Sequence, residues 1–207
     1  MRKSVVVAFV LTLALGTTLA AQKFTSIWKA PDVSTLGFAG KKVVALLMVD
    51  DQGIQVGGEE ALVRELTLRG VNGVAAYRMI PKEELRDKDA AKAWFTRAKV
   101  EGAVIMRLVS SDKETIVRPS MWVTSSYSTL WSYWGYGWTS VYVPGGSKTT
   151  TIVTIETLIF DVAKDKLVWA GVSEKTDPKG VQRTVNELVA AVIVEMRKDG
   201  LVPKDAK

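Results

Sequence analysis

The sequence contains neither cysteine nor histidine. Without cysteine the chain can form no disulfide bond, so its stability must come from an apolar core. The absence of both residue types removes the usual ligands of zinc, copper and haem, and it excludes Ser-His-Asp and Cys-His catalysis. The sequence therefore predicts no catalytic residues, no metal site and no cofactor, and a protein that is not an enzyme.

A concentration of charge of one sign is also missing. The 207 residues include 28 Lys and Arg against 22 Asp and Glu, which gives a formal net charge of +6. The basic residues are spread along the chain and form no run of five or more, whereas nucleic-acid-binding proteins gather them on one face. A nucleic-acid partner is therefore not expected.

The first 20 residues have the three parts of an export signal. Arg2 and Lys3 supply the positive start, an apolar run extends from Val5 to Leu15, and Thr18-Leu19-Ala20 places small residues before a cleavage site. The run is shorter than the ~20 apolar residues of a spanning helix, although an uncleaved membrane anchor is the alternative. Residues 1–20 are thus predicted to be a signal peptide cleaved near Ala20-Ala21. We expect a periplasmic or secreted protein with no transmembrane anchor after cleavage and no lipidation cysteine.

Residues 21–40 are predicted to be an N-terminal extended segment, and residues 41–203 a single α/β domain. The domain begins with three short apolar runs that alternate with two helical patterns, an order typical of parallel strands. Glycines 53, 57 and 58 are expected to form the turn that leaves the first strand. The strands are expected at Lys41–Asp50, Gly73–Ile80 and Ala103–Val109, and the helices at Glu59–Arg69 and Asp89–Glu101.

The C-terminal part contains a hairpin and a helix. Thr149–Asp161 and Leu167–Val172 are β-rich and flank a polar turn, which indicates an antiparallel hairpin. A helix is expected to begin at Asp177-Pro178, with a wide apolar stripe, and to stop at Gly200, where Leu201 packs back on the last turn. The predicted fold class is α/β (α+β): a mixed β-sheet with a βαβαβ start, a C-terminal antiparallel hairpin and a long C-terminal helix packed on the sheet.

An aromatic, Ser- and Gly-rich insert occupies residues 117–147. It contains no charged residue between Arg118 and Lys148, and it shows no helical or strict strand period, so many of its rings are not expected to be fully buried. Three interpretations stand side by side: recognition of a glycan or protein, contact with a membrane interface, or a structural loop that covers one edge of the sheet. The candidate binding residues are its eight aromatics: Trp122, Tyr127, Trp131, Tyr133, Trp134, Tyr136, Trp138 and Tyr142.

Four carboxylates lie near the end of the first predicted strand. Asp50, Asp51, Glu59 and Glu60 could serve as a general acid and base or hold calcium. They are equally explained as a turn and as acids at a helix N-terminus. Two charges inside the strands, Arg78 and Arg107, are expected at an edge or strand end and facing water.

The runs around the predicted strands resemble a group of bacterial envelope proteins, many of them lipoproteins. The similarity covers most of residues 41–202, including Gly70–Pro81, Gly102–Val109, Glu156–Asp161 and Leu167–Ser173. The fold that it implies is similar to the small α/β domain of TolB (its N-terminal part), CsgG and LpoB, which act through protein contacts in the periplasm. This chain departs from the group in lacking the lipidation cysteine and in having a richer aromatic insert.

The sequence thus favours an exported, non-enzymatic binding or accessory protein of the bacterial cell envelope. The partner is expected to be an envelope protein or a glycan such as peptidoglycan, contacted through the aromatic insert. A carboxylate-dependent glycan-acting enzyme and a purely structural envelope protein are the alternatives.

Overall fold

The computed structural model describes residues 24–33, 36–110, 127–138, 152–176 and 180–203. The predicted signal peptide lies outside these residues, as do Trp122 and Tyr142. No helix in the described part of the chain has the length and hydropathy needed to cross a membrane.

Six strands and five helices make up the described chain. In chain order they are β1 (Phe24–Lys29), β2 (Lys42–Met48), α1 (Gln52–Thr67), β3 (Asn72–Ala75), α2 (Ala76–Met79), α3 (Lys88–Ala98), β4 (Gly102–Ser110), α4 (Leu130–Gly137), β5 (Ile152–Asp161), β6 (Lys166–Thr176) and α5 (Val181–Lys198).

All six strands form one mixed sheet in the order β1-β6-β5-β4-β2-β3. The strand β2 pairs in parallel with both β3 and β4, as expected for strands joined through helices. The pairs β4–β5, β5–β6 and β1–β6 are antiparallel. The predicted α/β fold class is therefore confirmed, including its βαβαβ start and its C-terminal hairpin.

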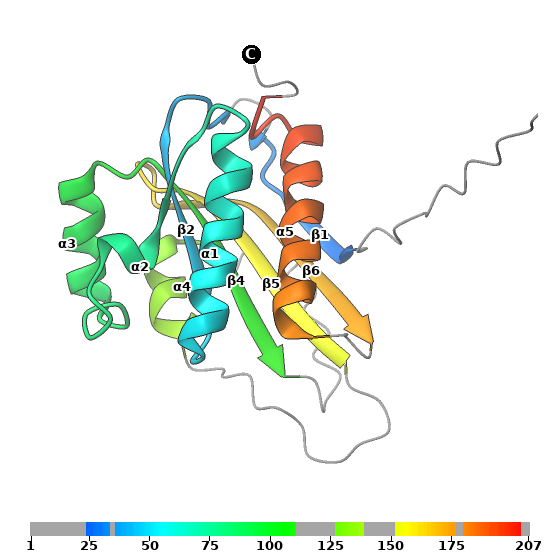
Figure 1. Ribbon diagram of the computed structural model, residues 1–207. Helices are drawn as coiled ribbons and strands as arrows, with labels where there is room; N and C mark the ends of the chain where they lie inside the picture. The colour runs from blue at the N-terminus through cyan, green and yellow to red at the C-terminus, as the bar shows by residue number, and fades with distance from the viewer. Residues whose placement is uncertain (1–23, 34–35, 111–126, 139–151, 177–179, 204–207) are drawn as a thin grey trace, which may run out of the picture.

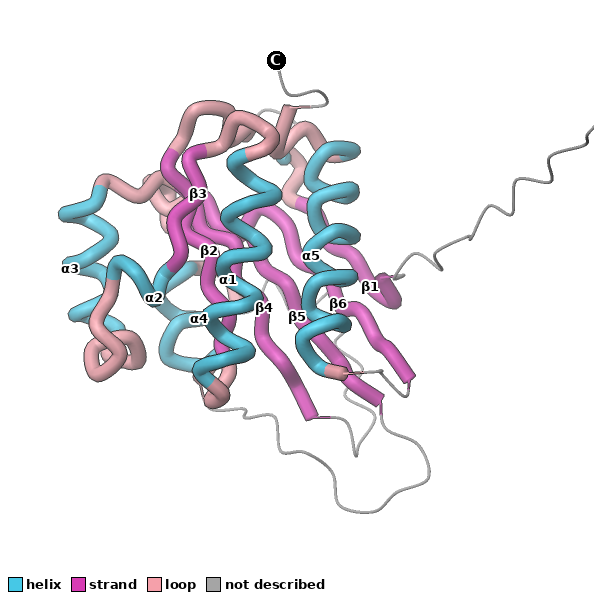
Figure 2. The backbone as a smooth tube through the Cα atoms, in the orientation of Figure 1, coloured by secondary structure: helices cyan, strands magenta, loops and turns pink. Residues whose placement is uncertain are grey.

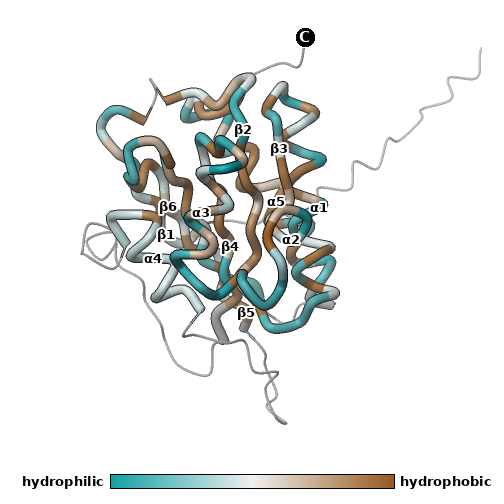
Figure 3. The backbone as a smooth tube through the Cα atoms, turned by 90° about the vertical axis from the view of Figure 1, so that its left-hand side faces the viewer, coloured by the Kyte–Doolittle hydropathy of each residue, from teal (hydrophilic) through white to brown (hydrophobic). Residues whose placement is uncertain are grey.

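Helices cover both faces of the sheet (Figures 1 and 2). Side chains of α1 and α5 form one core with the sheet, and side chains of α3 and α4 contribute to a second core on the opposite face. Figure 3 shows hydrophobic residues along the central strands, which are buried between these two layers. Both faces of the sheet are thus packed.

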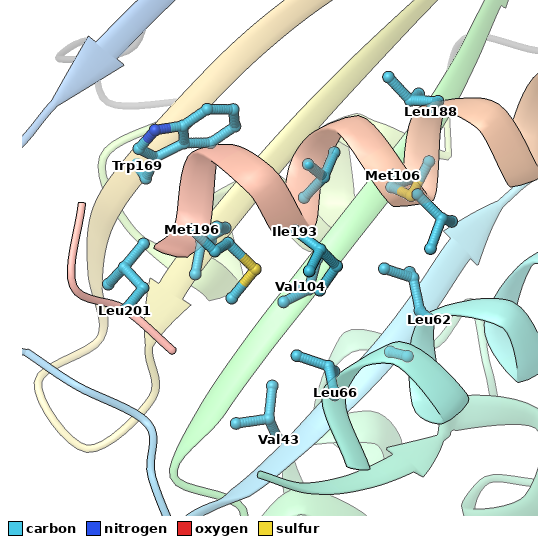
Figure 4. Packing of buried hydrophobic residues seen from close by; sticks show 14 of the residues in the cluster. Val43, Leu62, Leu66, Val104, Met106, Trp169, Leu188, Ile193, Met196 and Leu201 are labelled. Carbon is cyan, nitrogen blue, oxygen red and sulfur yellow. The ribbon is translucent and has the colours of Figure 1, made fainter. Parts of the chain in front are cut away.

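The first core follows the apolar stripe of the C-terminal helix. Figure 4 shows Ile193 and Met196 of α5, Leu62 of α1 and Val104 of β4 gathered in one cluster, all of them buried. The helix ends as predicted, because Gly200 adopts a φ of 76° and the buried Leu201 donates its N–H to the Met196 carbonyl at 2.8 Å.

Helix α1 begins seven residues earlier than predicted, at Gln52. Asp51 caps it by accepting the Ile54 N–H at 3.0 Å. The expected glycine turn is therefore wrong, since all three glycines lie inside the helix. Gly58 permits close packing instead, because a Cβ at this position would lie 2.6 Å from Leu47 Cδ2.

The strand predicted at Gly73–Ile80 is wrong in its second half. The chain leaves the sheet after Ala75 and forms the short helix α2, whose cap residue supplies no side-chain hydrogen bond. The carboxylate of Glu59 instead accepts the Tyr77 N–H at 2.8 Å from the neighbouring helix α1. A side chain from another helix thus pairs with a free N–H group at the start of α2, and the local sequence does not predict this contact.

Candidate functional site: the aromatic helix and the pocket beside it

The four predicted carboxylates serve different structural roles. Asp50 forms an ion pair with Arg86, and Asp51 caps α1. Glu60 accepts the Tyr77 hydroxyl hydrogen bond at 2.8 Å and pairs with Arg78. Across the described residues, no cluster of three or more acidic, cysteine or histidine side chains could hold a metal ion.

Glu59 departs most from its predicted place at a helix surface. It is fully buried, and its carboxylate accepts hydrogen bonds from Leu47 N–H, Gln55 Nε2 and Tyr77 N–H at 2.8–3.2 Å. Burial raises the pKa of Glu59 to about 7, against the opposing effect of these three donors. This side chain therefore fastens α1 to β2 and α2.

Part of the aromatic insert forms a helix, which the sequence did not predict. In α4, Thr129 Oγ1 accepts the Ser132 N–H at 3.2 Å as a local cap. Asp165, in the turn between β5 and β6, accepts the Leu130 N–H at 2.8 Å. These two side chains hold the start of the helix against the hairpin.

The inward side of α4 is part of the second core. Tyr133 and Trp134 are fully buried and Tyr127 is nearly so, which makes the expectation of incomplete burial wrong for these rings. Trp134 Nε1 donates to the Leu85 carbonyl at 3.0 Å. Three of the eight predicted binding residues are therefore anchors of the helix, and their rings are not available to a partner.

A buried ion pair lies under this helix. Arg107 on β4 and Glu156 on β5 face each other in the sheet register, and their charged groups are 2.9 Å apart. The expectation that Arg107 faces water is thus wrong, because its side chain is only 2% exposed. Arg78, in contrast, is exposed.

Aromatic side chains complete the surroundings of the pair. The Tyr133 hydroxyl donates to Glu156 at 2.8 Å, and the guanidinium of Arg107 lies 4.8 Å from the ring centre of Tyr136. Burial, followed by the Glu156 carboxylate, raises the pKa of Tyr133 well above its usual value. The phenol therefore stays protonated and remains a donor to the carboxylate.

The other described rings of the aromatic segment are only partly buried, and they pack against the rim of the second core. Trp131, Tyr136 and Trp138 are half-buried. The indole of Trp131 packs edge-on against Phe95 of α3, with ring centres 5.4 Å apart. The guanidinium of Arg86 lies over Trp138 at 5.2 Å from its ring centre. Each of these three rings has a basic neighbour: Lys92 beside Trp131, Arg107 beside Tyr136 and Arg86 beside Trp138.

A pocket of about 240 Å³ opens beside Trp131, between α3, the start of α4 and the β5–β6 turn. Figure 3 shows α3 and α4 on the same side of the sheet. The pocket is lined by Lys92, Phe95, Thr96, Lys99, Val100, Trp131, Val162 and Ala163.

Of the residues that line this pocket, Trp131 alone is a predicted binding residue. Lys92, Thr96 and Lys99 are not among the candidates that the sequence pattern indicates. A signal was available, because these three polar residues recur at intervals of four and three along α3 and so share one face of the helix. The meeting of that face with Trp131 is a product of the tertiary fold.

No protein-family model and no curated protein matches the chain. Among solved structures, the chain is similar to a PelC dodecamer from Paraburkholderia phytofirmans, with a TM-score of 0.46 and 11% identity over 86% of this chain and 97% of that one. It is also similar to the lipoprotein GNA1162 from Neisseria meningitidis, with a TM-score of 0.40 and 12% identity over 76% of this chain and 99% of that one.

Proposed function

We propose that this chain is an exported, non-enzymatic binding protein of the bacterial cell envelope. Its contact surface is the half-exposed Trp131 of α4 together with the adjoining pocket. The export signal predicted at residues 1–20 supports the envelope location.

The observation that carries the proposal is the division of the aromatic segment into two sets. The inward rings, Tyr133 and Trp134, are fully buried and fix α4 on the sheet. Trp131 on the same helix stays half-exposed at the mouth of a pocket. A rigidly mounted aromatic ring beside a pocket is a common feature of binding sites, because little conformational entropy is lost on contact.

The non-enzymatic part of the proposal is supported by how the candidate carboxylates are used. Asp50 and Glu60 form ion pairs with Arg86 and Arg78, and Asp51 caps a helix. Glu59 is buried against backbone N–H groups and does not line the pocket.

The test is a co-sedimentation assay of the purified exported chain with two envelope preparations, protein-free glycan and membrane protein. We expect binding to at least one of them, and about tenfold weaker binding by the Trp131→Ala variant. Trp28→Ala is the matched control, because Trp28 is also half-buried but lies on the edge strand β1. Its binding should equal that of the unmodified chain.

Equal binding by Trp131→Ala and the unmodified chain would contradict the proposed contact surface, provided that circular dichroism shows the variant to be folded. Release of new reducing ends from the glycan during the assay would contradict the non-enzymatic assignment.

A further inference from the structure

The pocket beside Trp131 has a basic lining. Lys92 and Lys99 both contribute to it and are exposed, and no acidic side chain is found among the described residues that line it. The two lysines are about 10 Å apart along the helix axis, given a rise of ~1.5 Å per residue. Each lysine carries its ammonium group on a flexible four-carbon stem, so both groups can reach one small anionic group held between them.

One wall of the pocket is an aromatic plane. Lys92 Nζ lies 5.8 Å from the ring centre of Trp131, which also packs against the rings of Phe95 and Trp134 at 5.4 and 5.8 Å between ring centres. The negative face of an indole attracts the C–H-bearing face of a sugar ring, as it attracts a cation. The wall therefore suits a ring-shaped ligand with a polarised apolar face.

The remaining polar group is a hydroxyl. Thr96 Oγ1 donates its proton to the Lys92 carbonyl at 2.9 Å, which leaves the oxygen as an acceptor for a ligand hydroxyl. The pocket thus offers ammonium donors, a hydroxyl acceptor and a flat ring. Its volume of about 240 Å³ is below the ~300–1,000 Å³ of pockets for drug-sized ligands, so it suits a single small unit.

The position of the pocket disfavours a phosphate. It lies at the C-terminal end of α3, where the helix dipole opposes negative charge and therefore opposes a doubly charged phosphate more than a singly charged carboxylate. The last carbonyls of α3 are already bonded to the N–H groups of Lys99 and Val100. A single negative charge on a carboxylate fits this environment better than a doubly charged group.

We propose that this pocket binds one sugar residue that carries a carboxylate, such as a uronic acid unit of an acidic polysaccharide. The ring lies against Trp131, and Lys92 and Lys99 pair with the carboxylate. The inference rests on the proposed function and names the ligand class of the same surface.

The test uses trigalacturonic acid, its methyl ester, and an acidic peptide, N-acetyl-diglutamate, as probes. The chain is labelled with 5-fluorotryptophan, and the fluorine resonance of Trp131 is assigned from its absence in Trp131→Phe. We expect the acid to shift this resonance in a saturable way and the ester to bind at least about tenfold more weakly, because it lacks the charge.

Lys92→Gln and Lys99→Gln should each weaken binding of the acid about fivefold, the scale of an exposed ion pair. Lys88→Gln is the control, because Lys88 is exposed on the same helix outside the pocket lining, and it should leave the affinity unchanged. All three substitutions are at exposed positions, so the fold is expected to persist.

Equal binding of the acid and its ester would overturn the inference, and so would binding of the diglutamate at least as tight as that of the acid. No shift of the Trp131 resonance with any probe would also overturn it. The proposed function is judged separately, because the loss of envelope binding in Trp131→Ala does not depend on the charge of the ligand.

Discussion

The buried Glu59 predicts that the stability of the fold depends on pH. Its carboxylate is fully buried between α1, β2 and α2, and hydrogen bonds from neutral donors hold it in place. Burial raises its pKa from 4.5 to about 7. The native protein therefore keeps a proton on Glu59 at pH values where the unfolded chain has released it.

The sign and size of the effect follow from this difference. Between pH 4.5 and about 7 the native state binds more protons than the unfolded state at this site, so the free energy of unfolding falls as the pH rises. One pKa unit corresponds to about 1.4 kcal/mol, so the loss is about 3 kcal/mol across this range. Above pH 7 the contribution of Glu59 no longer changes.

The perturbation is Glu59→Gln, which cannot titrate. It should destabilise the protein by about 1–3 kcal/mol at low pH. The reason is that the amide NH2 group would face one of the N–H donors, and neither group can accept a hydrogen bond. The measurement is urea unfolding at several pH values from 4.5 to 8, followed by circular dichroism. As the pH rises, the unmodified protein should lose about 3 kcal/mol of unfolding free energy relative to Glu59→Gln. The initial difference between the two proteins should therefore shrink and can change sign.

Glu60→Gln is the control, because it leaves the buried carboxylate in place. Its unfolding free energy should follow the same pH course as that of the unmodified protein. If the unfolding free energies of the unmodified protein and Glu59→Gln change in parallel from pH 4.5 to 8, then Glu59 does not keep its proton in the native state and the reasoning fails.

Three further predictions concern α4 and the ion pair beneath it. Arg107→Met should destabilise the protein by about 3–5 kcal/mol in urea unfolding, because the charge of Glu156 is left buried without its ion-pair partner. Adding Glu156→Met should restore at least half of this loss. No recovery in the double variant would contradict the ion pair. Gly137→Ala should lower the unfolding free energy by about 1–3 kcal/mol, because its methyl group would overlap a buried side chain. Gly135→Ala places its methyl group in open space and should be neutral or stabilising by up to about 1 kcal/mol. Equal effects of the two substitutions would refute the orientation of the helix. Trp134→Ala should lower stability by about 3–5 kcal/mol in the same assay, and a loss below about 1 kcal/mol would show that the ring is not core.

The sequence was sufficient for the parts of the fold that depend on local pattern. The central strands are continuous apolar runs because both of their faces are covered, and α5 has a stripe that is buried along its length. The hairpin was also predictable, since two β-rich segments flank a short polar turn.

The rest depended on contacts between distant segments. Leu130, Tyr133, Trp134 and Gly137 have helical spacing, but serine, glycine and aromatic residues have low helix propensity, and packing against the sheet overrides that preference. The burial of Glu59 and Arg107 could not be inferred locally either, because each charge is acceptable only beside partners from other strands and helices.

The pairing of β1 with β6 joins segments that are far apart in the chain, and it would bear on the order of folding during the proposed export. Thr25 Oγ1 bonds to the Val172 carbonyl across 147 residues, so β1 has no place in the sheet until the last hairpin has arrived. A chain that crosses a membrane from its N-terminus delivers β1 first and its partner nearly last. We therefore expect the segment next to the predicted cleavage site to stay unpaired, and accessible to a peptidase, until translocation is almost complete.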